Sequence, residues 1–595
     1  MRDFVISTKQ SEMACDPVRQ FLMFRSDSVA LPRSPNIRSS DRLAVMRFGA
    51  LTIAALISGT AQAQQVRDEG LRLLDEQRLR EKAELMARPP AEVTENTRVE
   101  SANASGDVNV NAIDEDGPTV IVKEIVLAGD QLLTQDEQQQ LVAPFLGRPL
   151  GAKRIDLLLQ RITAAYLDRG YITTRAYLSP QNLHSGRLEI TIIPGVIESI
   201  AVDGKPAPWL STVALPFSSG GSLRLADLEQ GVDQINRLRS RRAEAQILPG
   251  QTPGGSTIAI DTRAEKSWRV GAGVDNYGQS ATGERRQRIL AEFDNLLGLW
   301  DTWSFTTLES SNSHSDLLST SVPIGFGTFS YAYSRSSSET WLIPSVSKLR
   351  SESSSQTVGW NQVIYRDSRF RIALDSTVAL RESKRRLDTI ELKPQQQSTG
   401  RLASNVLYRG SRTVLSAEIG YSRGLAMFGS DVDIANLPRT SPHNDFEKWD
   451  ANANLSWQPI DGLTIRSVIA GQAARMGLPG QEQLFLGGAG SVRGFKEGSL
   501  SGDRGAYMRN EFSFSHELIR EAARSNVYVD PFLLFDASVS RLLSDPVDRH
   551  LASAGVGLRM NWKGLNADLA WAKPLTAPEW VSREARLHLL LSAQF

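Results

Sequence analysis

A long carboxyl-terminal stretch of the chain alternates apolar and polar residues with a period of two, the spacing of a β-strand with one apolar face. From Ser267 to Phe595, short alternating segments are separated by clusters of Gly, Asn, Asp and Ser. Within residues 554–563, apolar side chains occupy every even position, and the pattern resumes after a Lys563-Gly564 turn. At about 20 residues for each strand and its connection, the stretch accommodates roughly sixteen antiparallel strands.

Alternation alone fits either a soluble β-sandwich or a transmembrane β-barrel. Downstream of residue 64 there is no run of about 18 apolar residues, which excludes a transmembrane helix there. Residues 46–63 are typical of a signal peptide, with Arg47 as the basic start and Ala61-Gln62-Ala63 as the cleavage site. Export, together with Trp and Tyr near the ends of the apolar faces, favours a transmembrane β-barrel over residues 266–595.

The position of the signal peptide bears on the true start of the chain. Signal peptides begin a chain, so we interpret residues 1–45 as a gene-model extension and Met46 as the initiator. The single cysteine, Cys15, lies in that extension. We therefore expect the exported chain to have no thiol, disulfide or cysteine metal site.

Between the signal peptide and the barrel, the sequence predicts a helix, a linker and two α+β modules. Residues 64–88 carry leucines among charged residues and are followed by prolines, which is typical of a charged amphipathic helix. Residues 89–117 are polar and poor in aromatic side chains, as in a linker. Residues 118–195 and 196–265 each combine strands and helices in a similar order, and such tandem modules suit binding of extended segments by strand addition.

Within the first module, the pattern predicts helices over residues 134–145 and 152–168 and a strand over residues 187–193. In the second module it predicts a helix over residues 225–238.

Composition and motifs argue against an enzyme and against a nucleic-acid binder. Lys+Arg and Asp+Glu are balanced at 67 each, so the chain lacks the basic surplus that neutralises phosphates. Histidine is scarce, with 6 residues, and no zinc-protease, serine-hydrolase or P-loop motif occurs. We expect no catalytic residues, no cofactor and no metal site.

The most informative local sequence is the glycine-rich stretch 487–495, which ends in Arg493, Gly494 and Phe495. Its glycines permit tight turning, and Arg493 places a permanent cation at the tip of a long external connection. If that tip folds into the lumen, the cation needs an anionic partner. Asp536, which strand parity points inward, is the candidate. The alternative is an ordinary solvated arginine and an ordinary lumen carboxylate.

Two further charged residues, Arg509 and Glu511, share a parity that also points inward. We expect them to be polar residues of the lumen wall, since the interior of a transmembrane barrel is polar.

The order of these features resembles a known family. A signal peptide, a helix, a linker, two α+β modules, Val-Arg-Gly-Phe around Arg493 and Phe-Asp at Asp536 together resemble the TpsB transporters of two-partner secretion. These form the haemolysin secretion/activation group of the Omp85 superfamily. Residues 186–195 and Asp275-Asn276-Tyr277-Gly278 match as well, whereas Ser538 stands where members often carry glycine.

The resemblance implies an architecture and roles for individual residues. The expected fold is an outer-membrane barrel of about sixteen strands, preceded by two α+β POTRA domains in the periplasm. Residues 64–88 would plug the pore, although a helix packed on the first POTRA domain is the alternative. Arg493, Gly494, Phe495 and Asp536 would anchor the external loop inside the barrel.

The resemblance also implies partners. The POTRA domains would recognise a secreted TpsA-like exoprotein, with a haemolysin, an adhesin and a toxin equally open. The barrel would contact outer-membrane lipid, and the last strand, ending at Phe595, would be the signal for the barrel assembly machinery. Competing functions are an outer-membrane protein insertase, a passive porin and a surface-anchored adhesin.

Overall fold

A computed structural model describes residues 68–87, 93–95, 113–129, 132–208, 212–514 and 527–595. The predicted extension, the predicted signal peptide, Cys15 and most of the predicted linker lie outside these residues.

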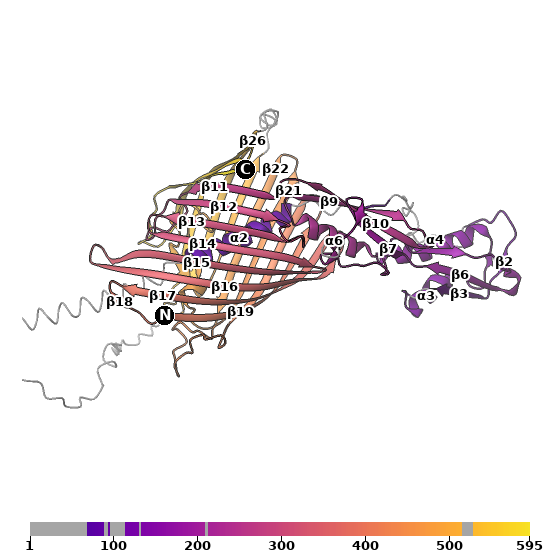
Figure 1. Cartoon of the computed structure of the whole chain (residues 1–595), viewed down its shortest axis with the longest axis horizontal. Coiled ribbons are helices and arrows are strands. Elements are labelled where there is room, and N and C mark those ends of the chain that lie inside the picture. Colours follow the sequence, from indigo (N-terminus) through magenta and orange to yellow (C-terminus); the bar gives the residue numbers. More distant parts are fainter. Residues whose placement is uncertain (1–67, 88–92, 96–112, 130–131, 209–211, 515–526) are drawn as a thin grey trace, which may run out of the picture. The chain divides into compact units, whose positions relative to one another are not determined.

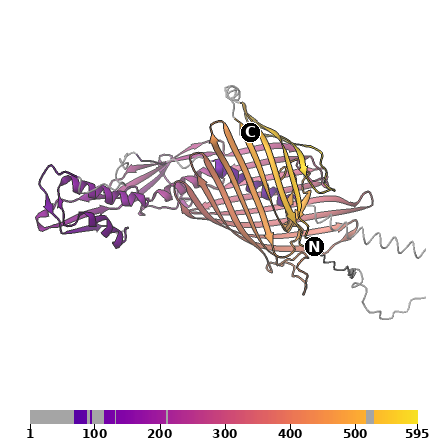
Figure 2. The ribbon, with the colours of Figure 1, turned by 180° about the vertical axis from the view of Figure 1, so that it is seen from behind.

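The carboxyl-terminal part is a closed antiparallel barrel of sixteen strands, with a short additional strand, β18, at one hairpin (Figure 1). Strand β11 pairs with β29 and closes the barrel, with Gly271 opposite Gln594. Figure 2 shows the strands of the second half from behind, coloured orange to yellow. The barrel strands are β11 (Trp268–Asp275), β12 (Arg286–Asp294), β13 (Thr302–Ser310), β14 (Ser313–Ile324), β15 (Gly327–Ile343), β16 (Ser347–Arg366), β17 (Phe370–Leu387), β18 (Ile390–Glu391), β19 (Gln395–Arg409), β20 (Thr413–Leu425), β21 (Glu447–Ile460), β22 (Leu463–Ala474), β25 (Arg504–Phe514), β26 (Val527–Arg541), β27 (Arg549–Trp562), β28 (Leu565–Thr576) and β29 (Arg586–Gln594).

Strand alternation separates the two faces of the barrel wall as predicted. Val556 and Trp562 are exposed on the outer face, whereas Asp536 is buried on the inner face. The turn between β27 and β28 consists of Lys563 and Gly564, both with positive φ, which matches a type I′ hairpin. The predicted barrel of about sixteen strands is confirmed.

The first α+β module forms a small sheet in the order β3-β6-β5, next to a two-stranded sheet of β2 and β4. The predicted helix 134–145 is divided into α3 and a 3₁₀ turn, because Pro144 has no N–H to continue the helix. The other predicted helix and the strand are found as predicted, as α4 and β6. The module consists of β2 (Val120–Ile121), β3 (Glu124–Gly129), α3 (Gln135–Val142), η3 (Ala143–Phe145), β4 (Pro149–Leu150), α4 (Ala152–Asp168), β5 (Arg175–Leu178), η4 (Leu183–Ser185) and β6 (Arg187–Ile193).

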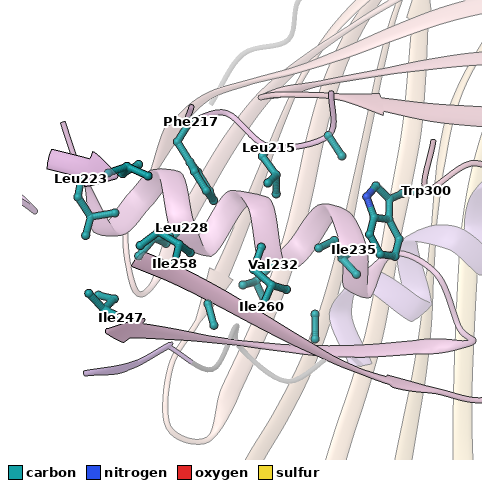
Figure 3. Close-up of a cluster of buried hydrophobic side chains, with 14 of the residues drawn as sticks. Leu215, Phe217, Leu223, Leu228, Val232, Ile235, Ile247, Ile258, Ile260 and Trp300 are labelled. Atoms are coloured by element: carbon teal, nitrogen blue, oxygen red, sulfur yellow. The ribbon is translucent and has the colours of Figure 1, made fainter. Parts of the chain in front are cut away.

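The second module packs α6 (Leu225–Asn236) on a sheet in the order β1-β9-β10-β7-β8. Apolar side chains on one face of α6, among them Leu228, Val232 and Ile235, meet the sheet in a buried core (Figure 3). Trp300, from the turn between β12 and β13, belongs to the same core. The sheet strands are β1 (Val93–Glu95), β7 (Val196–Val202), β8 (Lys205–Pro206), β9 (Arg241–Pro249) and β10 (Gly255–Ala264).

The amino-terminal helix α2 (Glu69–Ala87) contacts barrel strands β14, β15, β16 and β20. The helix predicted over residues 64–88 is therefore present. It contacts the inner wall of the barrel, and Glu84 near its end accepts a hydrogen bond from Arg239 of the second module at 3.0 Å. None of the described helices combines the length and the apolar character needed to cross a membrane.

Candidate functional site

The site is the polar lumen, into which one connection and helix α2 both reach. The connection comprises residues 475–503, between β22 and β25, and includes the hairpin of β23 (Leu484–Leu486) and β24 (Leu500–Gly502). Arg493 is only 3% exposed and Phe495 only 2%. The glycine-rich tip that the sequence singled out is thus enclosed by protein.

Arg493 and Asp536 are in direct contact. Arg493 Nε donates to Asp536 Oδ2 at 2.7 Å, and Nη2 donates to Oδ1 at 2.8 Å. The Arg493 backbone N–H adds a third bond to Oδ2 at 3.0 Å. Asp536 is 0% exposed. A bidentate pair of this kind fixes the orientation of the guanidinium as well as its position.

Glu511 is a second carboxylate partner of Arg493, a contact that strand parity did not predict. Its Oε1 accepts from Arg493 Nη1 at 2.5 Å, and its Oε2 accepts from Arg559 Nη2 at 2.5 Å. Arg509 lies farther off, with Nη2 3.4 Å from Glu511 Oε1. The guanidinium of Arg559 also stacks 4.4 Å from the ring centroid of Phe532. Arg559 Nε also donates to Asp568 at 3.1 Å, so Arg493 and Arg559 each donate hydrogen bonds to two carboxylates at this point of the wall.

Gly494 and Phe495 fit the loop tip to the wall by shape. Gly494 has φ +87, which strains any other residue, and a Cβ atom there would lie 3.1 Å from the carbonyl oxygen of Ala572, a tight contact. Its backbone N–H donates to His588 Nε2 at 2.9 Å. Phe495 is buried in an apolar cluster that includes Val492 and Leu551.

Ser538, the residue that departs from the expected glycine, lies two positions from Asp536. Its hydroxyl is buried and finds no hydrogen-bond partner among the residues that the structure describes. The contact of Arg493 with Asp536 is formed with serine in this place.

The root of the same connection is held by Glu482. Its carboxylate contacts Lys448 Nζ at 2.8 Å and Arg381 Nη1 at 3.3 Å. Burial favours the neutral acid, but these two cations outweigh it and lower the pKa of Glu482 from 4.5 to about 2. The connection is therefore fixed by charge at its root as well as at its tip.

Helix α2 is held against the lumen wall mainly by polar side chains. Glu76 Oε1 accepts from Arg286 Nη1 at 3.0 Å, and Oε2 accepts from Arg288. Arg72 Nη2 lies 3.8 Å from Glu497, which belongs to the connection that carries Arg493. The helix thus contacts both the wall and the loop.

The remaining contacts of α2 include one small apolar patch. Leu73 and Leu74 pack on Leu308 and Leu317. Further along the helix, Lys82 Nζ contacts Glu418 Oε2 at 2.8 Å.

The second α+β module also contacts the barrel through charges and backbone groups. Arg366 of β16 contacts Asp233 of α6 at 2.5 Å and Glu229 at 3.2 Å. Gln234 of α6 donates to the carbonyl oxygens of Gly325 and Gly327, in a hairpin of the barrel. These contacts join the second module to one end of the barrel, at the hairpin between β14 and β15.

Sequence reasoning missed several of these partners. His588 and Arg559 are at polar positions of alternating strands, so the sequence predicts that both point inward. It does not predict that they contact Gly494 and Glu511. The contacts of α2 with Arg286 and Arg288 join residues about 210 positions apart, a separation that leaves no local signal. The other predicted residue, Phe595, directly follows β29, and its backbone N–H donates to Val270 O at 2.9 Å.

Comparison with family models identifies the barrel and both modules. Residues 254–560 match the model described as haemolysin secretion/activation protein ShlB/FhaC/HecB. Residues 120–195 match a ShlB-type POTRA domain, and residues 196–249 match a second POTRA domain.

Individual relatives agree with these matches. The outer membrane transporter CdiB of Dickeya dadantii is 30% identical over 484 residues, which cover 78% of this chain and 84% of that protein. The hemolysin transporter protein ShlB of Serratia marcescens is 31% identical over 385 residues, covering 62% of this chain and 68% of that protein. The solved structure of CdiB from Escherichia coli is 27% identical, with a TM-score of 0.75, and the match covers 90% of this chain and 99% of that one.

Proposed function

Because this chain belongs to the haemolysin secretion/activation family of outer-membrane transporters, we propose that it exports its partner by withdrawing helix α2 from the barrel lumen. The barrel lies in the bacterial outer membrane, and the POTRA domains lie in the periplasm. The transporter moves a partner exoprotein through the barrel to the cell surface. The observation that carries the proposal is that α2 occupies the lumen and contacts four strands of its wall.

The first POTRA domain offers a surface for an extended exoprotein segment. Strand β5 (Arg175–Leu178) is at the edge of its sheet, and the side chains of Tyr177 and Leu178 are exposed beside that edge. An unpaired edge with exposed apolar side chains suits addition of a further strand. The exoprotein is a haemolysin, an adhesin or a toxin, and it is exported unfolded, so that its folding outside the cell gives the transport direction.

Two further parts of the proposal concern the barrel. The contact of Arg493 with Asp536 and Glu511 holds the connection 475–503 in place while the exoprotein passes. Strand β29, which is followed by the terminal Phe595, is the segment that the barrel assembly machinery recognises during insertion into the lipid bilayer.

A disulfide across the lumen tests the withdrawal of α2. A Cβ atom built on Gly70 lies 3.4 Å from Ser334 Cβ on β15, close to the spacing of a disulfide. Gly70→Cys with Ser334→Cys, in a chain carrying Cys15→Ser, is expected to cross-link α2 to the wall and to stop secretion of a co-expressed exoprotein. Reductant is expected to restore secretion.

Each single cysteine variant serves as a control and should secrete normally. Oxidation is checked by the mobility shift on non-reducing gels, and insertion is checked by the heat-modifiable migration of the barrel. Normal secretion by a fully cross-linked transporter would contradict the proposal.

A further inference from the structure

Among the connections between barrel strands, the longest after the Arg493 loop is the one between β20 and β21, residues 426–446. Successive turns of an antiparallel barrel alternate between its two ends, and the POTRA domains precede β11 on the periplasmic side. The connection 426–446 is therefore on the external side, together with the connection 475–503. It is outside the lumen site and has no part in the withdrawal of α2.

Three potential metal ligands converge in this connection. Asp433, His443 and Asp445 each offer one ligand atom, and these atoms all lie within 4.8 Å of one another. Nδ1 of His443 lies 3.3 Å from Asp433 Oδ2 and 3.6 Å from Asp445 Oδ1. The edge of a tetrahedron around a zinc ion with ligands at about 2.1 Å is about 3.4 Å. Both measured separations therefore fit neighbouring ligands of one ion.

The hydrogen bond made by the other ring nitrogen of His443 shows which nitrogen is free to bind a metal ion. Nε2 lies 3.0 Å from the carbonyl oxygen of Pro438. A carbonyl oxygen only accepts, so Nε2 carries the hydrogen, and in the neutral ring Nδ1 is left with a lone pair. That lone pair faces two carboxylates, an arrangement that repels unless a cation or a proton lies between them.

Metal-binding histidines have this same arrangement of hydrogen bonds. A histidine that ligates a metal through one nitrogen usually donates the other N–H to a backbone carbonyl or a carboxylate, which fixes the ring. His443 is 12% exposed in its side chain, so the ring is held in place.

Backbone contacts hold the carboxylates and the loop in place. The N–H of Asn444 donates to both oxygens of Asp433, at 2.9 and 3.0 Å. The N–H of His443 donates to Gly477 O at 3.0 Å, at the start of the connection 475–503. Phe446, next to the ligands, is buried with Leu478 of that connection.

We propose that Asp433, His443 and Asp445 bind one zinc-class divalent transition-metal ion at the external face of the barrel. Imidazole and carboxylate ligands together suit zinc, whereas calcium prefers oxygen ligands alone. Asp445 is 64% exposed in its side chain, so the fourth position of the ion is open to water. The ion clamps the connection 426–446 to the root of the Arg493 loop.

Zinc binding by the full-length transporter tests this site. Protein purified in detergent, with any histidine tag removed, is stripped with chelator and titrated with Zn²⁺ by calorimetry. Metal content is measured by mass spectrometry after desalting. The wild-type transporter is expected to retain one zinc per chain more than His443→Ala, and Asp445→Asn is expected to bind at least tenfold more weakly. Zinc should also raise the thermal midpoint of the wild type and leave that of His443→Ala unchanged.

His314→Ala is the matched control, because among the described residues His314 forms a single ion pair, with Asp316 at 3.1 Å, at the exposed start of β14. It should retain zinc binding. Asp445→Asn keeps the test valid if His443→Ala fails to fold. The side chain of Asp445 is exposed, so its replacement changes little packing. Equal zinc retention by wild type and both site variants would overturn the proposal. Tight calcium binding without zinc binding would do so too.

Discussion

The Arg493 loop tip and helix α2 lie in the same lumen, but they are held in different ways. Arg493 and Asp536 are almost fully excluded from solvent and share three hydrogen bonds. In the plug, the side chains of Glu76 and Arg288 are 31% and 30% exposed, and that of Lys82 is 29% exposed, whereas Arg72 and Glu69 at the start of the helix are as buried as the loop tip. The loop tip also has its own apolar cluster, whereas α2 packs Leu73 and Leu74 on two leucines of the wall.

This difference separates a permanent contact from a releasable one. Removing one partner of a buried pair leaves an uncompensated charge in a dry site, which is costly. Partly solvated pairs contribute about 0–1 kcal/mol each, because water replaces the lost partner. The lumen therefore combines a fixed loop with a helix that is buried at its start and whose ion pairs from Glu76 onward can be exchanged for water or for the exoprotein.

The largest effect is expected from Asp536→Ala. The substitution removes three hydrogen bonds to Arg493 and leaves its guanidinium with Glu511 alone among its carboxylates. We expect a loss of about 3–5 kcal/mol in the free energy of unfolding, with loss of secretion. Urea unfolding of the barrel in lipid vesicles measures the free energy of unfolding, and the amount of exoprotein in the medium measures secretion.

Asp548→Ala is the matched control for this prediction. Asp548 forms the same bidentate pair with Arg541, at 2.6 and 2.7 Å, but on the exposed connection between β26 and β27. Its loss should change neither stability nor secretion measurably. If the two aspartates behaved alike, burial would not be what distinguishes the loop tip.

The next effect is expected from Glu76→Gln, on the plug side of the comparison. Without this carboxylate, the helix loses its ion pairs with Arg286 and Arg288 of the wall, while Arg286 keeps its pair with Asp275. The helix should leave the lumen more often. We expect the fraction of open channels in planar bilayers to rise severalfold, with the unfolding free energy changed by less than about 1 kcal/mol.

Glu81→Gln separates a local effect on the helix from an effect on docking. Glu81 is on the same helix and accepts a hydrogen bond from Gln77 within it, at 3.0 Å. The fraction of open channels of the Glu81→Gln transporter should stay at the wild-type level. Unchanged conductance in Glu76→Gln would instead show that α2 is held by its apolar contacts.

Periodicity made most of the fold predictable. Alternation gave the strand number of the barrel, and helix α4 and strand β6 begin and end where the pattern predicted. The helix over residues 134–145 was predicted as one piece, and the division at Pro144 shows how a single missing N–H outweighs a good amphipathic pattern.

The site was predictable only in part, for a physical reason. Strand parity pointed Arg509, Glu511 and Asp536 inward, and the charge of Arg493 required an anion. Parity cannot say which inward residues meet, because that depends on register and on the path of a 29-residue connection (475–503). Glu511 was therefore expected to be an ordinary lumen residue, although it accepts a hydrogen bond from Arg493.

The last effect concerns Glu482, which holds the root of the loop and tests whether the loop is fixed at both ends. The pKa of Glu482 is lowered from 4.5 to about 2, against the effect of burial, by Lys448 and Arg381. Because the folded pKa is the lower one, the stabilisation is complete above pH 4.5 and is lost as the pH falls toward 2. We expect the thermal midpoint of the wild-type barrel to fall across this range, by the equivalent of about 1–3 kcal/mol from this group.

Glu482→Gln isolates this contribution from other carboxylates. Its midpoint should lie below that of the wild type at pH 7, and the two curves should converge as the pH approaches 2, because the wild-type side chain is then neutral as well. A constant gap between the curves would assign the effect to packing of the side chain. Packing and not charge would then hold the root of the loop. The contrast between the loop and α2 would rest on the ion pairs of Arg493 alone.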